Sequence, residues 1–165
     1  MKALFLLTTI ISVILAQTYL SKDGPIPICD FYTEGVARSG DNEFWKIVDG
    51  WKNIISSYPV RPNAVTKVTF QLVTGNYFML GCANMPDLSY VKRILGTWPN
   101  SHGFHTFYGT KYNNGLLPPI PYAAPTKEGD NITMTIDLRP MQKTVSYAKN
   151  GVSLGVATGG LNFWS

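Results

Sequence analysis

The chain has 165 residues, of which 45% are hydrophobic, with 14 Lys and Arg against 10 Asp and Glu. The formal charge of +4 is mild, and the basic residues are scattered, with Lys92 and Arg93 their only adjacent pair. Because a nucleic-acid surface needs Lys and Arg gathered along the phosphate path, this composition argues against a nucleic acid as partner.

Residues 1–16 have the pattern of a secretory signal peptide. Lys2 supplies a positive start, an apolar run extends from Ala3 to Ala16, and the chain becomes polar at Gln17. The run is short for a bilayer span, which takes about 20 residues, and the small Ala16 favours cleavage before Gln17. An uncleaved membrane anchor is the alternative. We therefore expect a secreted or extracellular protein with no membrane span after cleavage.

The chain after the leader is predicted to be one domain. Residues 17–27 contain glycine and prolines and form a lead-in segment, and the domain itself is assigned to residues 28–165. Near its start, Asp41 to Val48 places apolar side chains at helix-like spacing behind polar capping residues. A short helix and a strand are both compatible with that stretch.

A hairpin is predicted in the middle of the chain. Apolar and polar residues alternate over residues 67–73, and Gly75–Asn76 supplies a turn before a second strand over residues 77–83. Residues 84–97 predict a short helix or a long loop. The proline-rich residues 116–125 predict an extended connection along the surface.

The clearest pattern predicts a meander of three strands near the C-terminus. Apolar and polar residues alternate from Asn131 to Leu138, so one strand face lies on a core and the other in water. After an interruption that contains a proline, a second strand is expected from Val145 to Ala148. Asn150–Gly151 readily takes the positive φ angles of a two-residue turn, and alternation returns from Val152 to Val156. With no alternation of strands and helices, the chain is predicted to be an all-β, antiparallel β-sandwich.

The order of these pieces closely resembles the SPRY family, also called B30.2-related domains. The resemblance is carried by the Glu-Gly-Asp turn at residues 128–130 and by Lys-Asn-Gly-Val and Leu-Gly-Val-Ala within residues 149–157. Residues 75–83 and the stretch rich in glycine and aromatic residues at 96–115 also match. Residues 65–161 hold the clearest resemblance.

The resemblance implies a bent β-sandwich of the concanavalin-like jelly-roll type that binds partners through loops at one end. It brings no catalytic residue and no cofactor. Family members usually continue into a further strand, whereas this sequence ends at Ser165. Either Phe163 and Trp164 begin a shortened last strand, or the sequence is a fragment that lacks it.

Aromatic residues crowd the central stretch, and exposed rings on loops are common anchors of protein recognition. We expect a protein partner to contact some of these residues, although about half of them should lie in the core of a small sandwich. The candidates are Trp98, Phe104, His105, Tyr108 and Tyr112, with Trp98 and Tyr108 preferred. A glycan-binding, lectin-like sandwich is the alternative, because sugar faces stack on the same exposed rings.

An enzyme would need convergent reactive groups, and the sequence offers few. Asp41 with Glu43 and Glu128 with Asp130 have the i, i+2 spacing that places two carboxylates on one strand face of a sandwich glycosidase. Both pairs adjoin turn residues, which explains them more simply. We therefore expect a protein that is not an enzyme, with a glycoside hydrolase as the less favoured alternative.

Five other residues carry chemistry that the sequence leaves open. His102 and His105 are three residues apart, but no Cys or carboxylate lies beside them, so no metal site is expected. Cys29 and Cys82 form a disulfide in an oxidising compartment, or Cys82 packs unpaired in a strand. Asn131 opens an Asn-Ile-Thr sequon, a site for N-glycosylation in a secreted chain.

Overall fold

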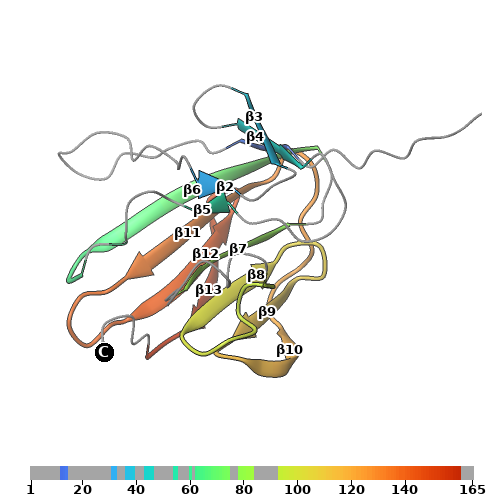
Figure 1. Cartoon of the computed structure of the whole chain (residues 1–165). Coiled ribbons are helices and arrows are strands. Elements are labelled where there is room, and N and C mark those ends of the chain that lie inside the picture. Colours follow the sequence, from blue (N-terminus) through green and yellow to red (C-terminus); the bar gives the residue numbers. More distant parts are fainter. Residues whose placement is uncertain are drawn as a thin grey trace, which may run out of the picture.

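A computed structural model gives the fold of the chain (Figure 1). It describes residue 60 and residues 62–74, 78–83 and 93–160 and, before residue 60, only the backbone of five short strands. Within these residues the chain is all-β, with antiparallel pairing and no helix. The predicted all-β antiparallel sandwich is confirmed.

The larger sheet contains seven strands. They are β1 (Ser12–Ile14), β3 (Val36–Ser39), β4 (Glu43–Lys46), β6 (Val65–Thr74), β11 (Asn131–Asp137), β12 (Thr144–Lys149) and β13 (Val152–Thr158). Their order across the sheet is β13-β12-β11-β6-β1-β4-β3. The strand β4 decides the choice between helix and strand near residue 43, and β1 falls within the segment interpreted as a signal peptide.

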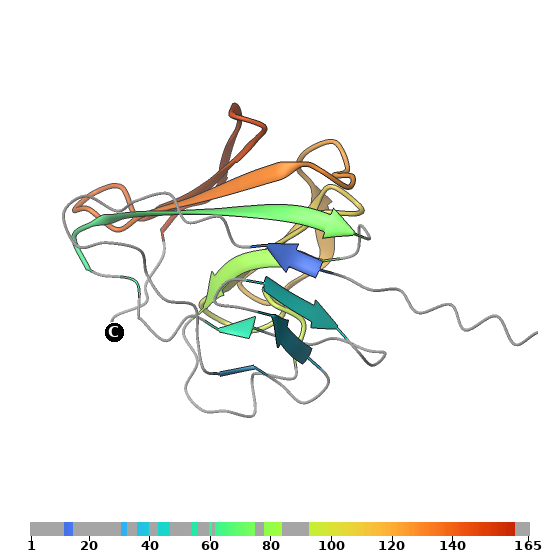
Figure 2. The same cartoon turned by 90° about the horizontal axis from the view of Figure 1, so that it is seen from above.

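The second sheet contains four strands, and a separate pair joins β2 (Phe31–Tyr32) to β5 (Ile54–Ile55). The four are β7 (Met79–Ala83), β8 (Ser101–His105), β9 (Thr110–Asn113) and β10 (Leu116–Pro121), in the order β10-β9-β8-β7. Because β6 and β7 lie in different sheets, the hairpin predicted from residues 67–73 and 77–83 is wrong, although both strands are present. Seen from above, β6 and β11–β13 lie in one layer and β8–β10 in another (Figure 2).

The strand β10 corrects the expectation of a connecting segment at residues 116–121. The chain there is extended and exposed as predicted, but it pairs with β9 at Leu116, Ile120 and Pro121. Leu116 and Ile120 are four positions apart in the chain, while their partners Asn113 and Lys111 are two positions apart, so the ladder is irregular between them. Prolines fit here because an edge strand needs no donor on its outer side.

The predicted meander of three strands is confirmed. β11 pairs with β6 on one side and with β12 on the other, and β12 pairs with β13. The turn between β12 and β13 has φ values of 50° at Asn150 and 81° at Gly151, as a two-residue turn with positive φ at both positions requires.

The core lies between the two sheets because alternate residues of each strand point inward. β11 shows this most clearly, with Ile132, Met134 and Ile136 buried and the residues between them partly exposed. The buried apolar cluster is Leu72, Phe78, Leu80, Cys82, Phe104, Ile132, Met134, Ile136, Leu138, Val145, Tyr147 and Ala157. It draws on β6, β7, β8, β11, β12 and β13, so the sandwich has one core.

The outer face of the four-stranded sheet is covered by the segment of residues 93–100. A Cβ added to Gly81 would lie 2.7 Å from Leu95, and one added to Gly96 would lie 2.5 Å from the Cβ of Tyr112. The segment consists of turns and bends, so in this part of residues 84–97 the loop alternative holds. Glycine is needed at these positions because two backbones approach closely.

Several predictions fall on residues outside those described. They are the lead-in segment 17–27, Cys29, the turn at Gly75–Asn76, residues 84–92 and the end of the chain at 161–165, including Phe163 and Trp164. In the part of the chain that the structure describes, no helix is long and apolar enough to cross a membrane.

Candidate functional site

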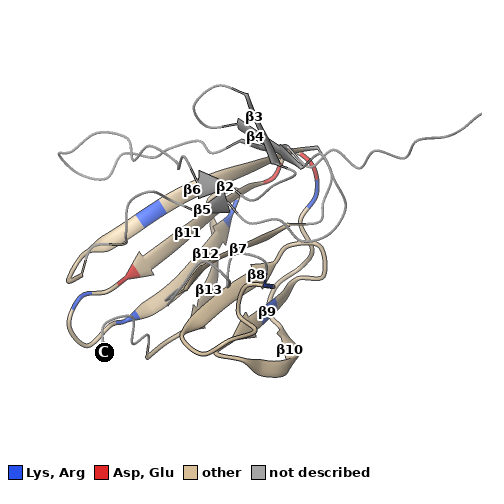
Figure 3. Ribbon diagram, in the orientation of Figure 1, with Lys and Arg blue, Asp and Glu red and all other residues tan. Residues whose placement is uncertain are grey.

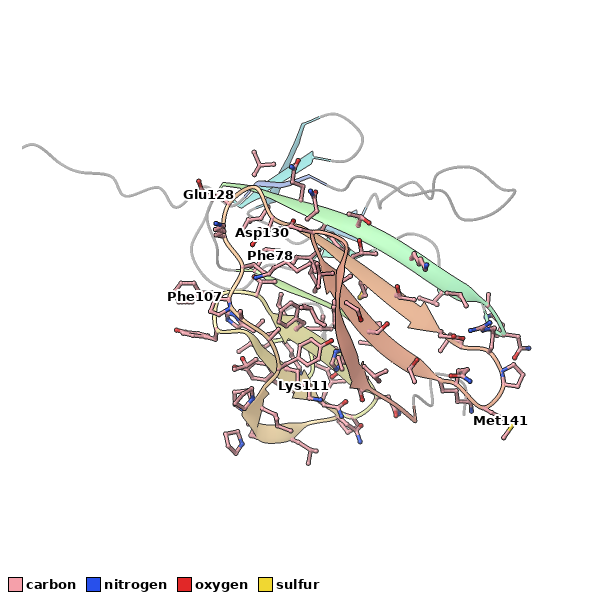
Figure 4. The ribbon with its side chains drawn as sticks, turned by 180° about the vertical axis from the view of Figure 1, so that it is seen from behind. Phe78, Phe107, Lys111, Glu128, Asp130 and Met141 are labelled. Atoms are coloured by element: carbon pink, nitrogen blue, oxygen red, sulfur yellow. The ribbon has the colours of Figure 1, made fainter. Side chains whose placement is uncertain are left out.

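Several chain reversals gather at one end of the sandwich. They are the β8–β9 turn at residues 106–109, the β10–β11 connection at residues 122–130 and the β12–β13 turn at residues 150–151. In Figure 4, Phe107, Glu128 and Asp130 lie at this end, while Met141 marks the opposite end. We call these three segments the loop end.

The β8–β9 turn is held rigidly by its backbone. The amide and the hydroxyl of Thr106 both donate to the Phe78 carbonyl, at 3.0 and 2.8 Å, and the Thr126 amide donates to the Thr106 carbonyl at 2.9 Å. The amides of Tyr122 and Ala123 both donate to the Gly109 carbonyl. The turn is therefore fixed to the neighbouring β10–β11 connection before any partner arrives.

Gly109 permits this close approach. Its φ is +65°, and an added Cβ would lie 1.9 Å from the Ala123 carbonyl oxygen. No other residue fits without moving one of the two segments. The position explains why a glycine follows the aromatic pair Phe107–Tyr108.

The turn presents one strongly exposed aromatic ring. Tyr108 is 57% exposed, and its ring centroid lies 4.8 Å from that of His105 and 4.9 Å from that of Phe107. The tyrosine ring packs against His105 in a tilted arrangement and against Phe107 edge to face. A large ring held in place on a rigid turn loses little conformational entropy when it binds.

A polar clasp joins the other two segments of the loop end. One carboxylate oxygen of Asp130 accepts from the Lys127 amide at 2.9 Å, and the other accepts from the Asn150 side-chain amide at 2.8 Å. The Asn150 side-chain oxygen accepts from the Asn131 amide at 2.9 Å. Asp130 therefore closes its own turn and anchors the β12–β13 turn.

The charge of Asp130 is stabilised at this position. Burial alone would raise the pKa of the carboxyl, but the hydrogen bonds from Lys127 and Asn150 and the charges of Lys149 and Lys127 outweigh it, so the pKa is lowered. Because both oxygens already accept hydrogen bonds, Asp130 is poorly placed as a catalytic acid beside the exposed Glu128. In the first carboxylate pair, the side chains of Asp41 and Glu43 lie outside the described residues.

Three of the predicted partner contacts are buried, which corrects their assignment. The exposed fraction is 4% for Trp98, 0% for Phe104 and 1% for His105. Phe104 points into the core, where its ring lies 5.0 Å from that of Tyr147, and Trp98 belongs to the segment that covers the outer face of the four-stranded sheet. These rings are needed for packing, so they cannot meet a partner directly.

Tyr108 and Tyr112 are the predicted candidates that reach the surface. Tyr108 is exposed and Tyr112 is half-buried, and both rings lie near His105, at 4.8 and 6.4 Å. The structure adds Phe107, which is half-buried beside Tyr108. The sequence indicated this position of Phe107 only by placing it directly before Tyr108 and the turn glycine Gly109.

The two histidines do not converge. His102 faces the core, with its ring 5.9 Å from that of Tyr147, whereas His105 lies on the other face of β8 with Tyr108 and Tyr112. Residues three apart on a strand point to opposite faces. Within the described ranges, no three His, Cys, Asp or Glu side chains form a group that would hold a metal ion.

Cys82 and Asn131 occupy clear positions in the sheets. Cys82 is buried on β7 and makes no disulfide with a described residue, and burial raises the pKa of its thiol to about 12. Since Cys29 lies outside the described residues, the disulfide stays a prediction. Asn131 is exposed at the start of β11 with its side chain on the outer face, so a glycan has room there, and its use also stays a prediction.

The described basic residues are not concentrated at the loop end. Figure 3 shows the Lys and Arg residues of the described strands and turns spread over both sheets. Lys127 and Glu128 are exposed side by side, and Lys149 donates to the Pro125 carbonyl at 3.2 Å. The loop end thus combines one exposed ring with charges of both signs.

Comparison with known proteins adds no family. No protein-family model matches the chain, and no significant match was found among curated proteins. The geometry of the loop end and the resemblance of the sequence motifs therefore carry the functional argument.

Proposed function

We propose that this chain is a secreted or cell-surface interaction module of the SPRY type, which binds a protein partner through the loop end and catalyses no reaction. The observation that carries the proposal is the position of Tyr108. Its ring is 57% exposed on a turn that five backbone and side-chain hydrogen bonds fix to neighbouring segments. Rigid, exposed aromatic side chains on loops are frequent binding anchors.

The same ring also suits the stacking of a sugar face, so a lectin is the second candidate. Exposed Glu128 and the backbone groups of its turn would supply polar contacts in either case. A glycoside hydrolase is less well supported, because the partner carboxylate Asp130 already has both oxygens engaged.

Binding is tested by affinity capture from extracellular and surface extracts, with intact and enzymatically deglycosylated extracts in parallel. The Tyr108→Ala variant should lose a defined protein partner, while Met141→Ala should keep it, because Met141 is 97% exposed at the opposite end. A photo-crosslinking amino acid at position 108, but not at position 141, should attach to that partner.

Three outcomes would count against the proposal. Capture that is unchanged in Tyr108→Ala would remove the loop end as the binding surface. Capture that disappears with the sugars would favour the lectin. Sugar release that is lost in Glu128→Gln would favour the hydrolase.

Secretion is tested separately by expressing the chain with its leader in a eukaryotic cell line. The expected product in the medium begins at Gln17, as determined by intact mass. Retention in the membrane fraction with Met1 still present would support the anchor instead.

A further inference from the structure

The strand β13 lies at one edge of the seven-stranded sheet and carries exposed apolar side chains. Among the strands that the structure describes, its single ladder partner is β12. Val152 is 69% exposed and Val156 is 59% exposed. An apolar edge strand offers its outer backbone groups to other chains, so proteins normally protect such an edge.

Two side chains, one from β9 and one from the residue that follows β10, bind the carbonyls of β13. The Tyr122 hydroxyl donates to the Gly155 carbonyl at 2.6 Å, and the Lys111 ammonium donates to the Ala157 carbonyl at 2.7 Å. The ammonium also lies 5.5 Å from the centroid of the Tyr122 ring, so the two donors support each other. We call Lys111 and Tyr122 the latch.

The strand is also irregular next to these contacts. Its ladder with β12 shifts register twice, between Val145 and Ser146 and between Tyr147 and Ala148. Gly155 has a φ of +85°, and its amide donates to the Ser153 hydroxyl at 3.2 Å. Bulges of this kind turn an edge away from straight pairing, and the latch holds the turned strand against the second sheet.

The neighbouring edge β10 is protected in a different way. Its prolines, Pro118, Pro119 and Pro121, have no amide hydrogen to donate, so no change of side-chain contacts can make this edge a complete pairing surface. The protection of β13 depends instead on two side-chain hydrogen bonds. Of these two edges, β13 is the one that can be opened.

We propose that Lys111 and Tyr122 keep β13 closed to strand addition, and that a second copy of this chain pairs with β13 when they are removed. Antiparallel pairing of β13 with itself satisfies two-fold symmetry, the commonest symmetry of protein dimers. Residues 152–158 contain no charged side chain, so identical strands meet without repulsion. Val152 and Val156 supply the apolar contact.

The test compares self-association of the purified chain with that of Lys111→Met, Tyr122→Phe and the double variant by sedimentation velocity. The wild type should be monomeric, and the double variant should self-associate with a dissociation constant lower by about tenfold or more. Lys143→Met is the matched control, because it removes an exposed lysine from the β11–β12 turn, outside β13. It should remain monomeric.

The location of the interface needs its own measurement. Adding Val156→Lys to the double variant should restore the monomer, since a charge on each facing strand opposes pairing. In the dimer, hydrogen exchange of the β13 amides should slow relative to those of β6.

Three results would overturn the proposal. The first is a double variant that keeps its near-ultraviolet circular dichroism and stays monomeric. The second is a dimer that survives Val156→Lys, and the third is a wild type that already pairs through β13.

If the double variant fails to fold, Tyr122→Phe alone decides, because it keeps the ring beside Tyr147 and Phe104 and removes one donor. No shift toward association in that variant would contradict the latch.

Discussion

The hydroxyl of Tyr147 donates a hydrogen bond of 2.9 Å to the Leu80 carbonyl and so joins the two sheets across the core. Tyr147 lies on β12 and Leu80 on β7, and both are buried. Burial, together with the proximity of Cys82 and Tyr122, raises the pKa of the Tyr147 hydroxyl well above its ordinary value. The group therefore stays protonated and acts as a donor wherever the protein is folded.

We predict that Tyr147→Phe lowers the free energy of unfolding by about 1–2 kcal/mol, because the ring remains while the Leu80 carbonyl loses a buried partner. Urea unfolding followed by circular dichroism measures the change. Tyr108→Phe is the matched control, and it should leave the unfolding free energy within about 0.5 kcal/mol of the wild type, since that ring is exposed. Equal losses in the two variants would contradict a special role for the bond to Leu80.

A second prediction concerns His102, whose side chain is fully buried and has no hydrogen-bond partner for either ring nitrogen among the described residues. Burial, and then the charge of Lys111, lower the pKa of His102 from 6.5 to about 4. The folded protein therefore binds its proton more weakly than the unfolded chain. The contribution of neutral His102 to the free energy of unfolding should be fully present above pH 6.5. It should be lost as the pH drops from 6.5 toward 4, by about 3 kcal/mol in total.

The variant His102→Leu should flatten that part of the pH profile. Cys82 and Tyr147, which share the core with His102, have raised pKa values and do not titrate in this range. Burial also lowers the pKa of His105. The variant His105→Leu is therefore measured as well, to determine how much His105 contributes to the pH dependence of stability. A slope between pH 6.5 and 4 that is unchanged in His102→Leu would show that other groups cause it.

The strands that the sequence predicted well are those covered on one face by the second sheet. In β11, alternation from Asn131 to Leu138 matches the burial of every second residue, because this central strand has a core on one side along its whole length. In β13, the same alternation leaves Val152 and Val156 exposed. A repeat of two shows that a strand has two faces, but it does not show whether another sheet reaches the edge where the strand lies.

The candidate site was predicted only in part for a similar reason. The stretch of residues 96–115 is rich in both glycine and aromatic residues, and its glycines serve two purposes. Gly109 supports the exposed turn at Tyr108, whereas Gly103 and Gly96 let residues 93–100 cover the sheet and bury Trp98. Composition cannot separate a glycine that makes a turn from one that allows two backbones to touch.

A third prediction tests the polar clasp of the loop end. Asn150→Gly removes both side-chain hydrogen bonds, to Asp130 and from the Asn131 amide, but keeps the positive φ that the turn requires. We expect a loss of about 1–3 kcal/mol in unfolding free energy, because the buried Asp130 carboxylate loses one of its donors and the exposed Asn131 amide loses its acceptor. Hydrogen exchange at residues 127–131 should quicken in the same variant.

Asn63→Gly is the control for that substitution. Asn63 also has a positive φ, 57°, but it is exposed, and its side chain makes no hydrogen bond to another described residue. Its replacement therefore reports the backbone effect of glycine alone. If Asn63→Gly and Asn150→Gly lower stability equally, the clasp contributes nothing beyond backbone entropy.

The fourth prediction separates the two aromatic residues that the sequence favoured equally. Trp98→Ala should lower the unfolding free energy by about 3–5 kcal/mol, because it leaves a cavity where the buried Trp98 side chain fills the interior. Tyr108→Ala should change stability by less than about 1 kcal/mol, because its ring is 57% exposed. Far-ultraviolet circular dichroism in urea measures both without relying on tryptophan fluorescence.

Loss of partner capture in Tyr108→Ala at unchanged stability would assign that loss to the surface, whereas any loss in Trp98→Ala has to be corrected for the unfolded fraction. A Tyr108→Ala protein as unstable as Trp98→Ala would mean that the turn is a structural part of the core and would remove it as a binding anchor.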